Sequence, residues 1–112
     1  MKGRYRATFV IPLDAHRVLG DAGWEFFSSN RIPQDVVDVL MAELVLVKSG
    51  AYLGMEEFSG ENAKATVLLD EQGQVESIYF RSYEERDIHG ALLRALTLLK
   101  DQAAVEVFSP SA

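Results

Sequence analysis

The pattern of apolar and polar residues is most regular around a turn-forming tetrapeptide, Asp70-Glu71-Gln72-Gly73. Runs of apolar residues flank it on both sides, within 65–69 and 75–82. Aspartate favours turns because its carboxylate accepts backbone N–H groups, and glycine adopts the positive φ that such turns require. We therefore predict a β-hairpin over these two segments. A lone hairpin is marginally stable in water, so the rest of the chain must cover it.

The register of this hairpin is left open, because both faces of its strands carry apolar residues. A shift by one residue moves every side chain of a strand to the opposite face. The first pairing groups Val67, Leu69, Val75 and Tyr79, and the shifted pairing groups Val67 and Leu69 with Ile78 and Phe80.

The N-terminal segment 4–11 also alternates between apolar and polar residues and predicts a first strand. Pro12 ends it, because proline has no N–H to donate to a neighbouring strand. Asp14 is a suitable N-cap, so we expect a short helix that reaches Leu19 or Ala22.

The densest group of aromatic residues follows, at Trp24, Phe26 and Phe27. Large aromatic side chains contribute much of the buried area of a protein. We expect this group to belong to the core, or to cover it, rather than to stack against a ligand.

The segment 33–48 has an apolar residue at nearly every third or fourth position and predicts a helix. Pro33 suits its first position, and Lys48 and Gly50 suit its end. The valines in this segment leave open that residues 44–47 begin a strand instead.

The second half of the chain contains one more helical pattern, over 84–100, which has the clearest apolar stripe. Residues 51–58 fit a short strand, although a helical extension or an irregular loop remain open. A last strand is predicted over 103–108, and residues 109–112 read as a frayed tail.

These elements predict one α+β domain that spans residues 1–112. Helices would pack on one face of an antiparallel sheet. The order of strands and helices favours a ferredoxin-like sandwich.

Charge narrows the classes of partner. The 112 residues carry a net charge of −6 and no cysteine. Residues 1–34 hold five basic and three acidic side chains, whereas residues 35–112 hold six basic and fourteen acidic ones. Such a surface repels nucleic acid and attracts a basic protein. The absence of cysteine, of a signal peptide and of a long apolar run predicts a cytoplasmic chain without a membrane span.

The sequence offers no pattern of catalytic, cofactor-binding or metal-binding residues. His16 and His89 stand far apart without the spacing of a zinc site, and no activated serine or lysine motif is present. Adjacent carboxylates such as those at 56–57 and 84–85 predict solvated surface positions. We therefore expect no cofactor and no enzymatic activity.

The first hypothesis for function is a small acidic protein-binding module, and specifically an immunity or antitoxin protein that neutralises a basic toxin such as a nuclease. Charge complementarity would accelerate association with that partner. The residues expected to bind it are Tyr83, Glu84, Glu85, Asp87, Glu56 and Glu57.

The second hypothesis is a small-ligand-binding protein or enzyme that acts as a homodimer. Two ferredoxin-like sheets would enclose a pocket lined by Trp24, Phe26, Tyr79 and His89. A structural subunit of a larger complex is a third possibility.

Overall fold

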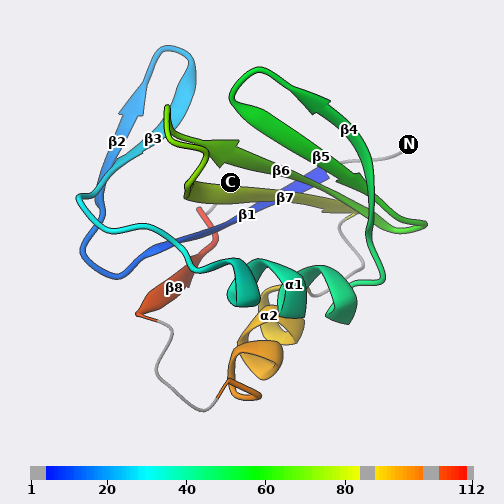
Figure 1. Cartoon of the computed structure of the whole chain (residues 1–112). Helices are drawn as coiled ribbons and strands as arrows, with labels where there is room; N and C mark the ends of the chain where they lie inside the picture. The colour runs from blue at the N-terminus through cyan, green and yellow to red at the C-terminus, as the bar shows by residue number, and fades with distance from the viewer. Residues whose placement is uncertain (1–4, 84–87, 100–103, 111–112) are drawn as a thin grey trace.

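The computed structural model describes residues 5–83, 88–99 and 104–110 (Figure 1). A six-stranded antiparallel sheet, a separate β-hairpin and two helices make up an α+β fold. In chain order the elements are β1 (Tyr5–Pro12), β2 (His16–Gly20), β3 (Gly23–Phe27), α1 (Gln34–Glu43), β4 (Val47–Tyr52), β5 (Met55–Ser59), β6 (Ala63–Leu69), β7 (Val75–Tyr83), α2 (Ile88–Leu96) and β8 (Val105–Phe108).

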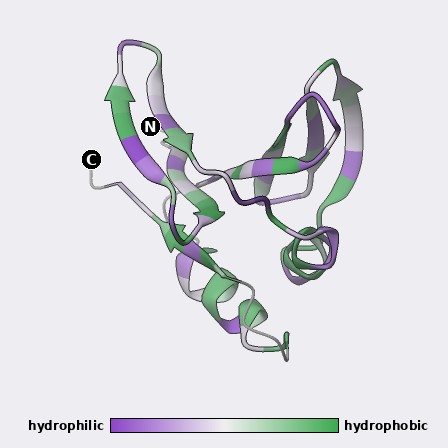
Figure 2. Cartoon of the chain, turned by 60° about the vertical axis from the view of Figure 1, so that its left-hand side comes forward, coloured by the Kyte–Doolittle hydropathy of each residue, from purple (hydrophilic) through white to green (hydrophobic). Residues whose placement is uncertain are grey.

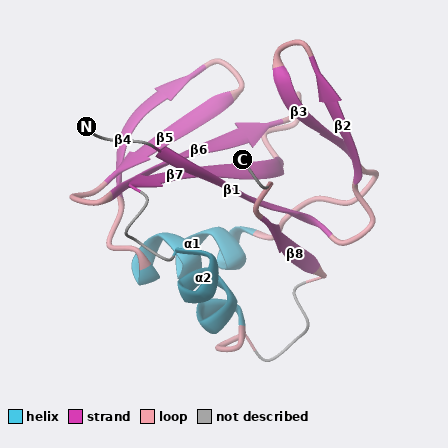
Figure 3. Cartoon of the chain, turned by 180° about the vertical axis from the view of Figure 1, so that it is seen from behind, coloured by secondary structure: helices cyan, strands magenta, loops and turns pink. Residues whose placement is uncertain are grey.

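The strands of the large sheet follow the order β4-β5-β6-β7-β1-β8, and every neighbouring pair is antiparallel. Four consecutive strands form a meander, and β1 and β8 extend it beyond β7. This order does not show the ferredoxin-like topology that the sequence favoured. Both helices lie on one side of the sheet (Figure 3), as predicted.

The two faces of the sheet have different roles, because successive side chains of a strand point to opposite sides. Val10, Val67, Ile78 and Phe80 are fully buried on the face that packs against α1 and α2. Hydrophilic and hydrophobic bands alternate along the strands (Figure 2). We call the opposite side the outer face; Phe9 belongs to it, as do its cross-strand partners in β7 and β8.

The β6–β7 hairpin confirms the predicted turn. One carboxylate oxygen of Asp70 accepts the backbone N–H groups of Gln72 and Gln74, both at 2.9 Å. Gly73 has a φ of 79°, where a side chain would be strained. Arg31 donates from Nε to the other oxygen of Asp70 at 2.8 Å, so this turn also anchors the segment before α1.

The register is the one that places Val67 beside Ile78 and Ala65 beside Phe80. Tyr79 consequently points to the outer face, paired with Thr66. An irregularity after Leu68 brings Leu69 opposite Val75.

The prediction of a short helix after Asp14 is wrong. Residues 16–27 form the β2–β3 hairpin, whose turn lies between Gly20 and Gly23. The carboxylate of Asp14 accepts hydrogen bonds from Ser28 and Asn30 instead of capping a helix. A capping residue marks only where a helix can begin, and two glycines within four positions disfavour its continuation.

The helix predicted over 33–48 is shorter, because α1 ends at Glu43 and β4 begins at Val47. Pro33 is the residue before the helix rather than its first member. Val45 adopts a positive φ of 56°, which ends the helical path. Lys48 and Gly50, expected as the stop signal, belong to β4, so the alternative of a strand near 44–47 was closer.

Residues 51–58 belong to a hairpin rather than to one short strand, since β4 and β5 join at a turn where Gly54 has a φ of 83°. The last helix is confirmed over Ile88–Leu96, and residues 97–99 form a turn. The predicted positions 84–87 and 100 lie outside the described residues. The last strand is confirmed over Val105–Phe108.

The α2 stripe makes a direct prediction about stability. Leu92 is 0% exposed against α1 and the sheet, whereas Leu93 beside it is 47% exposed. Leu92→Ala should lower the free energy of unfolding by roughly 2–5 kcal/mol, through lost apolar contact and a cavity. Leu93→Ala is the matched control and should cost well under half as much. Equal denaturant midpoints for the two variants would contradict this packing.

The turn at Asp70 predicts acid sensitivity. Its hydrogen bond with Arg31, helped by the N–H groups of Gln74 and Gln72, holds the pKa of Asp70 below its ordinary 3.8. A carboxyl whose pKa is lower in the folded state stabilises the fold above its unfolded pKa, and this contribution disappears as pH falls through the folded value. We expect the free energy of unfolding to decrease as the pH drops below about 3.8. Asp70→Asn should be less stable than wild type at neutral pH and should lose less stability in acid. Denaturant unfolding at a series of pH values measures this dependence. The control Glu71→Gln, in the same turn, should show the same dependence of unfolding free energy on pH as wild type. If Asp70→Asn also lost as much stability in acid as wild type, the prediction would be refuted.

Candidate ligand-binding cleft

The β2–β3 hairpin lies against the outer face of the sheet through aromatic contacts. Phe26 on β3 packs on Phe9 of β1, with ring centroids 4.9 Å apart. The rings of Trp24 and of Phe108 on β8 are nearly perpendicular, with centroids 5.0 Å apart. Phe9 also stacks on Tyr79 of β7 at 4.9 Å and an interplanar angle of 16°. Four strands that are distant in sequence therefore contribute to one aromatic cluster.

Arg17 on β2 also attaches the hairpin to the sheet. The guanidinium of Arg17 lies 4.5 Å from the centre of the Phe108 ring and forms an ion pair with Glu106. Arginine over an aromatic face is attracted by the negative potential of the ring. The contact shows that this cluster already accommodates one cation beside a carboxylate.

Between the hairpin and the sheet lies a hollow of about 510 Å³, which we call the cleft. Such a volume lies within the range of small-ligand sites, roughly 300–1,000 Å³. The wall on the hairpin side is the segment 22–27, and the floor comes from β1, β6 and β7. The floor residues are Ala7, Phe9, Leu68, Glu76, Ser77 and Tyr79.

The charges that line the cleft are both negative. Glu25 and Glu76 are its two charged lining residues. Glu25 has no ion pair within the described part of the chain. Arg31 approaches Glu76 only to 3.7 Å, and its Nε is already bonded to Asp70. The cleft therefore has negative charge available for a ligand.

Aromatic walls and carboxylates together suit a positively charged guest. Ring faces attract ammonium and guanidinium groups, most strongly the indole of tryptophan. A carboxylate adds a charge-assisted hydrogen bond.

Other hollows fit a ligand less well. A larger one, of about 710 Å³, lies beside the β6–β7 turn. Two of its polar lining residues, Arg31 and Asp70, already bind each other, and the hollow has no aromatic wall. We therefore place the candidate site in the cleft.

Of the six residues predicted to bind a partner, only Glu56 and Glu57 have side chains that the structure describes. Glu84, Glu85 and Asp87 lie outside the described residues, and Tyr83 is described only as the end of β7, where its backbone pairs with Tyr5.

Glu56 and Glu57 are neighbours on β5 and point to opposite faces. Glu56 pairs with Lys48 at 3.2 Å. Glu57 accepts a hydrogen bond from Thr66 at 3.3 Å and lies on the outer face. A pair of adjacent carboxylates in a strand cannot act as one acidic patch.

The second hypothesis expected a pocket lined by three aromatic residues and a histidine. Trp24, Phe26 and Tyr79 do line one cavity. His89 does not, because it lies on α2 at the other side of the sheet, where its Nδ1 is 2.7 Å from Ser109 Oγ. This cavity lies within one chain, between a sheet and a hairpin.

Three of the cleft residues were not identified from the sequence. Phe9 belongs to an ordinary alternating strand, and Glu25 and Glu76 are isolated carboxylates. A signal existed only for Glu25, which stands between Trp24 and Phe26. On a strand, that carboxylate points away from both rings, so its position at the cleft needed the hairpin to be known.

Among the described residues, no three His, Cys, Asp or Glu side chains gather into a group that could hold a metal ion. Neither described helix is long and apolar enough to cross a membrane. No protein-family model matches the chain, and no curated protein and no solved structure is significantly similar to it.

Trp24 is the single tryptophan of the chain, so its fluorescence reports on the cleft alone. We expect benzyltrimethylammonium to change the emission of Trp24 in a saturable manner. Its neutral analogue neopentylbenzene, in which carbon replaces the nitrogen, should bind more weakly because it has no charge for the rings and carboxylates.

The double variant Glu25→Gln/Glu76→Gln should weaken binding of the ammonium compound by about tenfold and leave the neutral one unaffected. Glu61→Gln/Glu71→Gln removes the same charge away from the cleft and is the matched control. Equal binding of the two compounds to wild type would exclude a cation site.

Proposed function

We propose that this protein is a small acidic binding module whose cleft receives a lysine or arginine side chain of a basic protein partner. In this proposal the aromatic rings hold the inserted cation, the two glutamates attract it from the rim of the cleft, and the remaining outer face contacts the surface around it. The observation that carries the proposal is the cleft itself, where aromatic walls meet two carboxylates and no lining cation.

The charge of the whole chain supports the same kind of partner. A net charge of −6 raises the rate of encounter with a basic protein and leaves the short-range contacts to set the lifetime of the complex. Aromatic and arginine side chains are frequent hot spots of interfaces. A partner arginine in an aromatic cleft would combine both.

Exposed apolar side chains border the open part of the outer face. Leu19 at the tip of the β2–β3 hairpin is 64% exposed, and Tyr52 near the tip of the β4–β5 hairpin is equally exposed at 64%. Leu68 on the floor is also exposed. Exposed apolar side chains that gather on one surface are typical of an interaction surface.

The specific form of this proposal is an immunity or antitoxin protein that inhibits a basic toxin such as a nuclease. Small size, acidic charge and a preformed recognition surface all suit rapid capture of such an enzyme. A free small cationic ligand is the second candidate, favoured by the cleft volume of about 510 Å³.

The test begins with the protein that co-purifies with the tagged chain at native expression, followed by titration of the two purified proteins. The cleft variant Glu25→Gln/Glu76→Gln should raise the dissociation rate by tenfold or more, because it removes contacts made in the complex. The control Glu61→Gln/Glu71→Gln should lower only the association rate, through the reduced overall charge. Equal dissociation rates for both variants would refute recognition through the cleft.

The toxin form makes a separate prediction. Expression of the partner alone should arrest growth of the host cell, and co-expression of the wild-type chain should restore it. The cleft variant should restore growth poorly, whereas the control variant should restore it fully. A partner that is harmless on its own would contradict the immunity function and leave the binding function in place.

A further inference from the structure

A second feature of the outer face is a pair of cations on neighbouring strands. Lys64 on β6 lies directly opposite Arg81 on β7, and both project to the outer face. Like charges directly opposite each other in a sheet repel and destabilise it. The pair is unexpected in a chain with a net charge of −6.

The surroundings of the pair leave much of its positive charge unneutralised. Lys64 is exposed and has no ion pair among the described residues. Arg81 has one carboxylate neighbour, Glu57, at a long 4.0 Å. The second oxygen of Glu57 already accepts the hydroxyl of Thr66.

One donor of Arg81 is also left without a partner. Its Nε is buried and finds no hydrogen-bond acceptor in the described part of the chain. An unpaired buried donor has a cost in free energy, and such groups in native proteins point to an unseen partner. The guanidinium is oriented by the Tyr79 ring, 5.6 Å from its centre to the Arg81 carbon.

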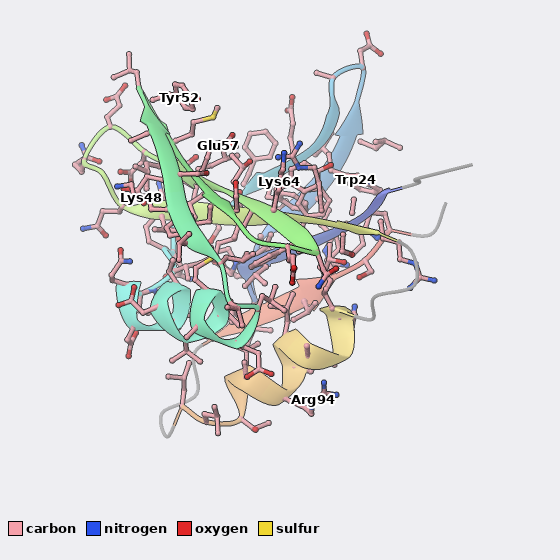
Figure 4. The ribbon with its side chains drawn as sticks, turned by 90° about the vertical axis from the view of Figure 1, so that its right-hand side faces the viewer. Trp24, Lys48, Tyr52, Glu57, Lys64 and Arg94 are labelled. Carbon is pink, nitrogen blue, oxygen red and sulfur yellow. The ribbon has the colours of Figure 1, made fainter. Side chains whose placement is uncertain are left out.

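The residues that flank the cation pair in the sheet are small. Arg81 is flanked on β1 by Ala7, and Lys64 is flanked on β5 by Ser59, so small residues stand on both sides of the cation pair. Ala7 also lines the cleft. Figure 4 shows Lys64, Glu57 and Trp24 on the opposite side of the molecule from Arg94, which α2 carries.

We propose that Lys64 and Arg81 form an oxyanion site, which binds a carboxylate or a phosphate group at the edge of the cleft. The arginine offers a fixed planar donor set, and the lysine adds a mobile charge. A bound oxyanion would both relieve the repulsion between the cations and accept a hydrogen bond from Arg81. This site does not depend on the cationic partner proposed above.

The test follows the ¹H–¹⁵N signal of Arg81 Nε during titration with inorganic phosphate and, separately, with acetate. We expect a saturable shift with at least one of them; phosphate alone identifies a phosphate site, and acetate identifies a carboxylate site. Lys64→Gln should weaken binding by about tenfold or more, whereas Lys48→Gln, whose lysine pairs with Glu56, should not change it. A shift that sodium chloride reproduces, or that persists in Lys64→Gln, would overturn the site.

Stability gives an independent measurement. If Lys64 serves binding at the expense of the fold, Lys64→Glu should raise the Tm of the unliganded protein, because it converts a repulsive cross-strand pair into an attractive one. Phosphate or acetate should raise the Tm of wild type and not that of Lys64→Glu. A lower Tm for Lys64→Glu would show that the lysine is structural and would contradict the proposal.

Discussion

The alternation of side chains along β1 and β7 is the constraint on which the rest of the structure depends. It places Val10 and Ile78 against the helices, and Phe9 and Tyr79 on the outer face. The first set forms the main core, and the second forms the aromatic cluster that holds the β2–β3 hairpin. A shift of one residue in this pairing would exchange the two surfaces and remove both the core and the cleft.

The cleft follows from how the hairpin is attached. Aromatic contacts and the Arg17–Phe108–Glu106 contact lie at the β1–β8 side of the sheet, so the hairpin covers that part and leaves the floor toward β6 open. The Arg31–Asp70 bond fixes the segment that follows the hairpin onto the β6–β7 turn. The cleft is therefore bordered by two fixed attachments, which favours a preformed site over one that is assembled on binding.

Much of the fold could be predicted from local pattern, and three aromatic residues of the site were named from the sequence, but the cleft itself could not be predicted. The Asp70 turn, the α2 stripe and strands β1, β6 and β7 each carry their own signal, in turn residues or periodicity. The β2–β3 hairpin was missed for two reasons. Asp14 resembles a helix cap, and the strands of the hairpin are stabilised by contacts with Phe9 and Phe108, which lie outside the hairpin in the sequence. Without this hairpin the cleft could not be predicted, because only the tertiary structure brings Glu25 and Glu76 to the same hollow. The two carboxylates at 56–57 point to opposite faces of the sheet because side chains alternate along a strand.

The central claim is that a cation of a partner enters the cleft, and hydrogen–deuterium exchange of the complex tests it most directly. We expect the partner to slow exchange in residues 22–27 and 76–79, which line the cleft, while α1 and α2 keep the exchange rates of the free protein. Protection confined to the helices, with the cleft segments unchanged, would contradict the claim.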